Sequence, residues 1–112
     1  MIRPAQSLAI GLSVLAGMLA VSVPPARADV SPSRAAELEH MVRQDCGACH
    51  GMTLQGGLGS PLRPDNLAEL SDEAIFVTIQ DGRPGTPMPP WRGMLSDDDI
   101  RWIIQYLRTA KP

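Results

Sequence analysis

The stretch Cys46-Gly47-Ala48-Cys49-His50 decides how the rest of this 112-residue chain is interpreted. The chain has two cysteines, and both lie in this stretch, so that one short turn presents both thiols. A disulfide between them would close a very small loop and stabilise the fold little. The spacing is typical of three kinds of site: a redox-active dithiol, half of a zinc site and a covalent haem attachment site.

The surrounding sequence favours the haem site. A dithiol oxidoreductase normally has a βαβ context, and the chain shows no strand pattern. A zinc site needs four ligands, and no second Cys/His pair is present. In a c-type attachment site, the thiols of Cys46 and Cys49 add across the two haem vinyl groups, and the adjacent His50 serves as the proximal iron ligand. We therefore expect one covalently attached haem c, with its iron.

A methionine is expected as the distal iron ligand, because His/Met ligation is the cytochrome c pattern that raises the reduction potential. Met88 lies in Thr86-Pro87-Met88-Pro89-Pro90, whose prolines restrict the backbone and so lower the entropy cost of ligation. Met94 is an alternative, as is an iron without a methionine ligand. Met52 follows His50 too closely to reach the opposite face of the haem.

The hydrophobic spacing predicts an all-α fold with long loops. Helices are expected over residues 34–45, at a short turn near Asp65, from Ser71 to a stop at Gly82, and after the N-cap residue Ser96. Residues 46–63 are rich in glycine and are expected to form a loop. The apolar stripe of the last helix consists of Ile100, Ile103, Ile104 and Leu107.

Two further residues of the first helix could be mistaken for iron ligands. Met41 is expected to fill the core, as methionines often do. His40 lies ten residues before His50 among charged neighbours, and we expect it to face solvent. A bis-histidine site through His40 is geometrically poor.

Residues 1–28 have the pattern of a cleaved secretory signal peptide. Arg3 precedes an uncharged stretch over residues 8–23, and Ala26-Arg27-Ala28 gives a small-x-small cleavage site. Sixteen residues of helix would span about 24 Å, less than the roughly 30 Å hydrocarbon core, which favours cleavage over a retained anchor. We expect a periplasmic mature protein, residues 29–112, without a membrane span.

The mature chain would be one small domain with an acidic balance. Its eight Lys and Arg and twelve Asp and Glu give a formal charge of −4, and the basic residues are not clustered, so a nucleic-acid partner is not expected. A domain of 84 residues has a small hydrophobic core and usually needs additional stabilisation by a disulfide, a metal or a large cofactor. Covalently bound haem would supply that apolar mass.

On these residues the chain resembles a class I cytochrome c. The resemblance consists of a helix running into Cys46-Gly47-Ala48-Cys49-His50, a middle helix, a methionine loop and a C-terminal helix ending in Tyr106-Leu107. It implies a cytochrome c fold, with three to four short helices around one covalently bound haem. The first and last helices would cross, and the contacts there would be Leu38 and Val42 against Ile103 and Tyr106.

A narrower resemblance covers most of the mature chain. Gly56-Gly57-Leu58-Gly59, Leu70-Ser71-Asp72-Glu73 and the stretch from Gly82-Arg83-Pro84-Gly85 to Trp91 are similar to the small monohaem cytochromes of denitrification operons, the NirC or cytochrome c-55X type. That resemblance implies an electron donor to periplasmic cytochrome cd1 nitrite reductase or a helper in maturing its haem d1.

The function expected from these features is that of a one-electron carrier and not of an enzyme. Its partners would be redox proteins: cytochrome cd1 nitrite reductase or another respiratory complex downstream, and another cytochrome or a quinol-oxidising complex upstream. Docking is expected through an apolar surface at Met88, Pro89 and Pro90, with Arg83 and Arg92 at its rim. An enzyme or gas sensor would need an open iron position, which a bound Met88 would close.

Overall fold

The computed structural model describes Ser22 and residues 28–111. Its helices are α1 (Pro32–Met41), α2 (Gly47–His50), α3 (Pro64–Leu67), α4 (Asp72–Asp81) and α5 (Asp97–Thr109), and a π-helical turn, Val42–Cys46, joins α1 to α2. Within these residues there is no β-strand, only an isolated bridge between Arg92 and Leu95. The all-α prediction is confirmed. The signal peptide expected over residues 1–28 lies almost entirely outside the described residues.

The first helical segment is longer than the sequence predicts. Ser31 caps α1 by accepting a hydrogen bond from the Arg34 N–H at 3.2 Å, and Pro32 follows in the first turn, where its missing N–H is not needed. At the other end the helical backbone continues to His50, so the prediction of a loop from Cys46 is wrong for residues 46–50. Gly47 is buried with helical backbone angles despite the low helix propensity of glycine, and Met52 lies close against it.

The later helices begin where the capping residues predict. The Ser71 hydroxyl accepts a hydrogen bond from the Ala74 N–H at 3.1 Å, and α4 ends at Gly82. Ser96 caps α5 in a reciprocal capping box with Asp99. The short turn near Asp65 forms as α3, but Leu70 lies beyond it and is exposed.

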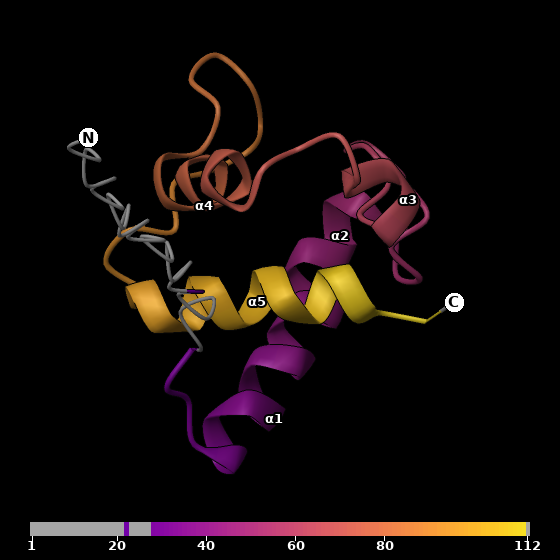
Figure 1. The fold of residues 1–112 in the computed structure, drawn as a ribbon. Helices are drawn as coiled ribbons and strands as arrows, with labels where there is room; N and C mark the ends of the chain where they lie inside the picture. The colour runs from indigo at the N-terminus through magenta and orange to yellow at the C-terminus, as the bar shows by residue number, and fades with distance from the viewer. Residues whose placement is uncertain (1–21, 23–27, 112) are drawn as a thin grey trace, which may run out of the picture.

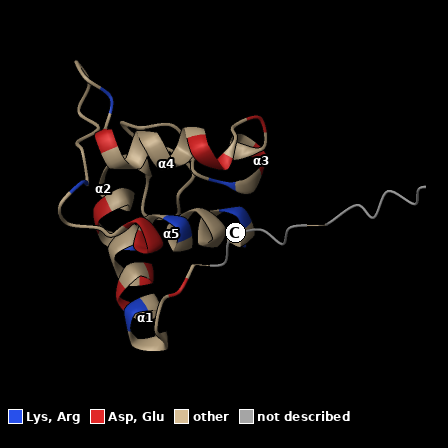
Figure 2. Ribbon diagram, turned by 60° about the vertical axis from the view of Figure 1, so that its left-hand side comes forward, with Lys and Arg blue, Asp and Glu red and all other residues tan. Residues whose placement is uncertain are grey.

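Helix α5 lies between α1 and α4 in both ribbon views (Figures 1 and 2). It buries its whole apolar stripe, while Leu38 and Val42 are completely buried on the α1 side. Ile103 belongs to the same core cluster, and the half-buried Tyr106 packs against it, in agreement with the crossing implied by the resemblance. The core residues are Leu38, Val42, Leu54, Leu67, Ile75, Leu95, Ile100, Ile103, Ile104 and Leu107.

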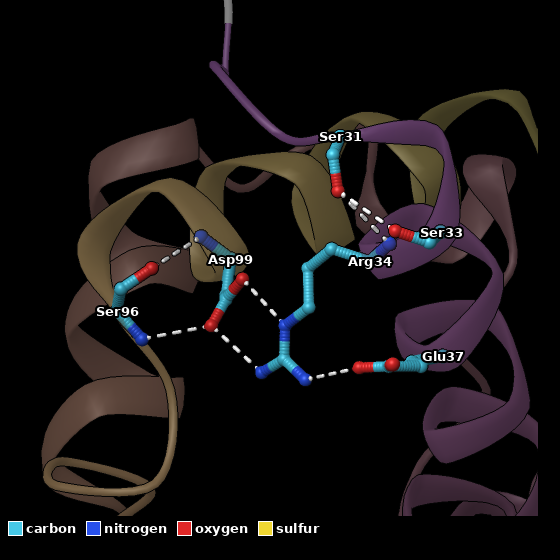
Figure 3. Close-up of polar contacts among 6 residues, drawn as sticks. All are labelled: Ser31, Ser33, Arg34, Glu37, Ser96 and Asp99. Atoms are coloured by element: carbon cyan, nitrogen blue, oxygen red, sulfur yellow. Dashed lines mark hydrogen bonds and ion pairs between the residues drawn. The ribbon is translucent and has the colours of Figure 1, made fainter.

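A polar cluster ties the start of α1 to the start of α5 (Figure 3). The Arg34 guanidinium donates to both carboxylate oxygens of Asp99, at 3.1 and 2.9 Å, and to Glu37 at 2.9 Å. Asp99 is buried, and it also accepts from the Ser96 N–H at 3.0 Å. These bonds hold its pKa below the ordinary value, first because of Arg34. The cluster therefore fixes the crossing of the two helices by a charge-assisted pair.

The charges outside this cluster are dispersed. Figure 2 shows Lys and Arg spread over several elements and interspersed with Asp and Glu, without a continuous basic face in the part of the chain that is described. Among the described residues, five arginines form ion pairs with carboxylates: Arg34, Arg43, Arg92, Arg101 and Arg108. Among the described helices, none is both long and apolar enough to cross a membrane.

Candidate haem-binding cavity

A cavity of about 430 Å³ lies between α2, the loop that follows it, α4, the proline-rich loop and α5. Its walls are mainly apolar, with Leu67, Ile75, Ile79, Trp91, Leu95, Ile103 and Leu107 among the lining residues. A volume of this size is within the roughly 300–1,000 Å³ of small-molecule and cofactor sites. The cavity occupies the position that a core would fill in a larger domain.

The structure brings the four candidate site residues of the sequence together around this one cavity. Cys46, Cys49 and His50 line it from the end of the first helical segment, and Met88 lines it from the proline-rich loop. Cys46 and Cys49 are both free thiols, each partly buried. The helical backbone through residues 46–50 places them about one turn apart, close to the His50 ring.

The His50 ring is held by the loop that follows α2. Its Nδ1 lies 2.6 Å from the carbonyl oxygen of Ser60. A carbonyl only accepts hydrogen bonds, so Nδ1 carries the proton in this contact and Nε2 is left as the atom able to bind a metal. Gly59 packs flat on the ring: a Cβ at Gly59 would lie 2.7 Å from the ring atoms Cε1 and Nδ1 of His50. The ring orientation therefore depends on the loop as well as on α2.

Of the other methionines and histidines considered as ligands, only Met41 lines the cavity. Met94 and Met52 are exposed, at 62% and 58%, and neither lines the cavity. Met41 is half-buried, packs on the core and lines the cavity wall, and His40 is exposed on α1. Met88 is therefore the methionine that lines the cavity from the proline-rich loop, whereas His50 lines it from α2.

Comparison with known proteins agrees with this geometry. Residues 33–107 match the family model described as cytochrome c oxidase, cbb3-type, subunit III. The chain is 50% identical over 100 residues to cytochrome c55X of Paracoccus denitrificans, covering 89% of this chain and 91% of that protein. This chain belongs to the cytochrome c55X family of class I c-type cytochromes.

Two further similarities extend the comparison. A solved structure of the c-type cytochrome NirC superimposes on this cytochrome with a TM-score of 0.69 and 47% identity, covering 70% of this chain and 93% of that one. The dihydro-heme d1 dehydrogenase of Pseudomonas aeruginosa is 38% identical over 74 residues, which is 66% of this chain and 15% of the enzyme. The family's cofactor is haem c, which the attachment motif predicts.

The cavity of this cytochrome fits haem c. Both thiols lie on one wall, as two thioether bonds to adjacent vinyl groups require, and the His50 ring has the tautomer needed for iron binding. Burial, with a smaller contribution from Asp45, raises the pKa of the Cys46 thiol to about 11. The site therefore suits an uncharged sulfur, which is what a thioether is.

The mouth of the cavity is bordered by exposed side chains. Leu58 is 78% exposed, and Pro87, Pro89 and Arg83 are also exposed while lining the cavity. The sequence places Arg83 and Arg92 together at such a rim, but only Arg83 lines the cavity. Arg92 is instead hydrogen-bonded to side chains of α4.

Ser60 and Gly59 hold the His50 ring, and the residue pattern by itself does not predict this role. Ser60 acts through its backbone carbonyl, whose direction is not encoded by the side chain at that position. Gly59 acts through the space its missing Cβ leaves for the His50 ring. Gly59 belongs to the Gly56-Gly57-Leu58-Gly59 stretch that resembles the cytochrome c-55X type, but neither that resemblance nor the high glycine content after His50 predicts a specific contact.

Proposed function

We propose that this cytochrome is a one-electron carrier in which His50 and Met88 are the two axial iron ligands. The observation that carries the proposal is that both side chains line one cavity, His50 from α2 and Met88 from the proline-rich loop. Haem c supplies the one-electron couple between ferrous and ferric iron. The protein's part is to hold the ligands in place, to exclude water with an apolar wall, and to present a cofactor edge to partners.

The same arrangement supports a carrier and not an enzyme. An enzyme or a gas sensor would need an open iron position, and Met88 would close it. Anaerobic titration of the reduced protein with carbon monoxide tests this. We expect no spectral change at concentrations that saturate a five-coordinate haem, whereas rapid binding would indicate an open site and contradict the proposal.

Electron exchange with partners is proposed to take place at the cavity mouth. Leu58, Pro87 and Pro89 give that mouth an exposed apolar border, and a contact limited to such a small area is typical of weak electron-transfer complexes. Leu58→Ser should therefore slow electron transfer to a partner protein without changing the reduction potential. Val77→Ser is a matched control, because Val77 is exposed but does not line the cavity.

The proposed acceptor is cytochrome cd1 nitrite reductase. The similarity to cytochrome c55X of Paracoccus denitrificans and to NirC supports a place in denitrification. Stopped-flow mixing of the reduced cytochrome with oxidised reductase tests the assignment. Second-order electron transfer fast enough to support turnover is expected, and slow transfer to this acceptor would favour a different respiratory acceptor.

A second candidate function is assistance in maturing haem d1 of that reductase. It is favoured by the similarity to a dihydro-heme d1 dehydrogenase over two thirds of this chain. Deletion of the gene separates the two functions. A reductase isolated without its haem d1 would support the maturation role, whereas a reductase with full haem d1 but slow nitrite reduction in cells would support the donor role.

The proposed location is the periplasm, with a mature N-terminus at Asp29. The proposal rests on the charge and hydropathy pattern of residues 1–28 and on the attachment motif. Mass spectrometry of the protein released from the periplasm should give residues 29–112 plus one haem. A membrane-bound species that retains residues 1–28 would contradict it.

A further inference from the structure

The loop that carries Met88 is fastened to α4 at its C-terminal end. The backbone N–H groups of Trp91 and Arg92 donate to the carbonyl oxygens of Ile79 and Gln80, at 3.0 and 3.1 Å. These two bonds lay residues 91–92 alongside the last turn of α4. Met88 is therefore on a loop that leaves α4 at Gly82 and returns to it nine residues later.

A further backbone hydrogen bond closes the interior of the loop. The Arg83 N–H donates to the Met88 carbonyl oxygen at 3.2 Å, so the chain just after α4 is bonded to the chain at the proposed ligand. Gly82 lies beneath that contact with a φ of +66°, and a Cβ there would be 2.6 Å from the Met88 carbonyl oxygen. A movement of the Met88 backbone away from the start of the loop would therefore break the Arg83–Met88 hydrogen bond, and a side chain at Gly82 would not fit beneath it.

The Arg92 side chain holds the C-terminal end of the loop against α4. Its Nε donates to Asp81 Oδ1 at 3.1 Å, and a terminal nitrogen contacts the same oxygen and also Gln80 Oε1 at 3.1 Å. Gln80 in turn donates to Asp97 at the start of α5, at 3.4 Å. The guanidinium thus joins the loop to two successive side chains of α4, and through one of them to α5.

We propose that Arg92 is a positioning residue that keeps the Met88 loop closed and so sets how often Met88 leaves the iron. The inference rests on the proposed function, in which Met88 is the distal ligand. Arg92 does not line the cavity, so it acts only through the loop. Because Asp81 and Arg92 are exposed, the pair contributes little to global unfolding, but it opposes the local opening that releases Met88.

The test compares Arg92→Gln with Arg43→Gln in the haem-loaded protein. Arg43 pairs with Glu39 at similar exposure but lies on the π-helical turn, away from the Met88 loop. The measured quantity is the rate of imidazole binding to the ferric protein at saturating imidazole, where release of Met88 limits the rate. Arg92→Gln should raise this rate about two- to fivefold, the factor expected for loss of an exposed ion pair, and Arg43→Gln should leave it unchanged.

Two further measurements exclude a general loss of stability. Denaturant midpoints of the two variants should shift by similar small amounts. Arg92→Lys should give an intermediate imidazole rate, because one ammonium group can reach Asp81 or Gln80 but cannot reproduce the forked contact with both. Equal imidazole rates in Arg92→Gln and Arg43→Gln would overturn the proposal.

Hydrogen exchange separates this inference from the ligand assignment. If Met88→Ala leaves the imidazole rate of the wild-type protein unchanged, Met88 is not the ligand and the proposed function fails. The effect of the Arg92 side chain on the loop can then still be measured by hydrogen exchange of the Trp91 and Arg92 backbone amides. Those amides should exchange faster in Arg92→Gln than in Arg43→Gln, and equal exchange would overturn the positioning role whatever the ligand is.

Discussion

His50 shows at the scale of one residue how the two nitrogens of an imidazole ring are given different tasks. Nδ1 is hydrogen-bonded to the Ser60 carbonyl oxygen, which leaves Nε2 as the nitrogen that would bind iron in the proposed function. A carbonyl partner on the far nitrogen also increases the electron-donating character of the ligand, which favours the ferric state. Gly59 allows this contact because the His50 ring occupies the space that a side chain at position 59 would need.

Gly59→Ala should therefore raise the reduction potential. The added methyl group would collide with the His50 ring, rotate it and weaken the bond to the Ser60 carbonyl, so that the ferric state loses stabilisation. Spectroelectrochemical titration measures the change. Ser60→Ala keeps the backbone carbonyl and serves as the control, with an unchanged potential expected. A potential equal to that of the wild type in Gly59→Ala would show that the ring position does not depend on this contact.

Replacement of Met88 distinguishes it from Met94. Ligation by a thioether stabilises ferrous relative to ferric iron, so Met88→Ala should abolish the Met–Fe charge-transfer band, lower the potential and open the iron to added ligands. Met94→Ala should leave the spectrum nearly unchanged, because Met94 is exposed and outside the cavity. The opposite pattern would identify Met94 as the ligand.

Among the helices, α5 is the one with the most complete local signals. The serine N-cap, the acidic first turn and the apolar stripe all agree with the observed Asp97–Thr109. What these signals do not predict is the second task of Asp99. The same carboxylate that completes the capping box of α5 also accepts a hydrogen bond from Arg34 of α1. Asp99 therefore stabilises both the start of α5 and the crossing of α1 and α5.

Asp99→Asn should destabilise the protein in a pH-dependent way. The folded-state pKa of Asp99 is lowered, so its ionised form stabilises the fold above the ordinary carboxyl pKa of about 4, and this contribution is lost as pH falls through the lowered value. At pH 7 we expect a loss of about 1–3 kcal/mol in the free energy of unfolding. Urea unfolding at a series of pH values should show the difference from wild type shrinking below pH ~4. If the difference in the free energy of unfolding stayed constant with pH, the effect would come from the capping box with Ser96 and not from the charge on Asp99.

For the whole molecule, the haem cavity is part of the core and not an addition to it. Buried residues of α3, α4 and α5 form both the hydrophobic cluster and the cavity wall, including Leu67, Ile75 and Ile103. Without haem, water would reach the apolar walls of this cavity of about 430 Å³, so the polypeptide alone would lose part of the apolar burial that stabilises the fold. A domain is stabilised by only roughly 5–15 kcal/mol in total, so that loss is serious.

Loss of haem attachment should therefore prevent stable folding. Cys46→Ser with Cys49→Ser, exported without bound haem, should show little helical circular dichroism and no cooperative thermal transition. The single variants, which can keep one thioether bond, should be intermediate. A haem-free double variant with a cooperative transition would mean that the polypeptide core is sufficient by itself.

The sequence by itself determined the features that depend on residues close together in the chain. The attachment motif, the serine caps of α4 and α5 and the apolar stripe of α5 each involve groups within one or two turns, so residue type and spacing are enough to predict them. The cap at Ser31 is not predicted, because the first helix is expected to begin at residue 34. The same reasoning missed the continuation of the helix through Gly47, because the packing of Met52 on that glycine depends on how the chain turns after His50.

Only the tertiary structure decided which distant groups meet. Arg34 and Asp99 are 65 positions apart, and the sequence offers many carboxylates with which Arg34 could pair. The Ser60 carbonyl reaches His50, and Arg92 returns to Asp81, because of backbone directions that no single residue specifies. These contacts orient the proposed ligands, whereas the identity of the ligands follows from the local chemistry of cysteine, histidine and methionine.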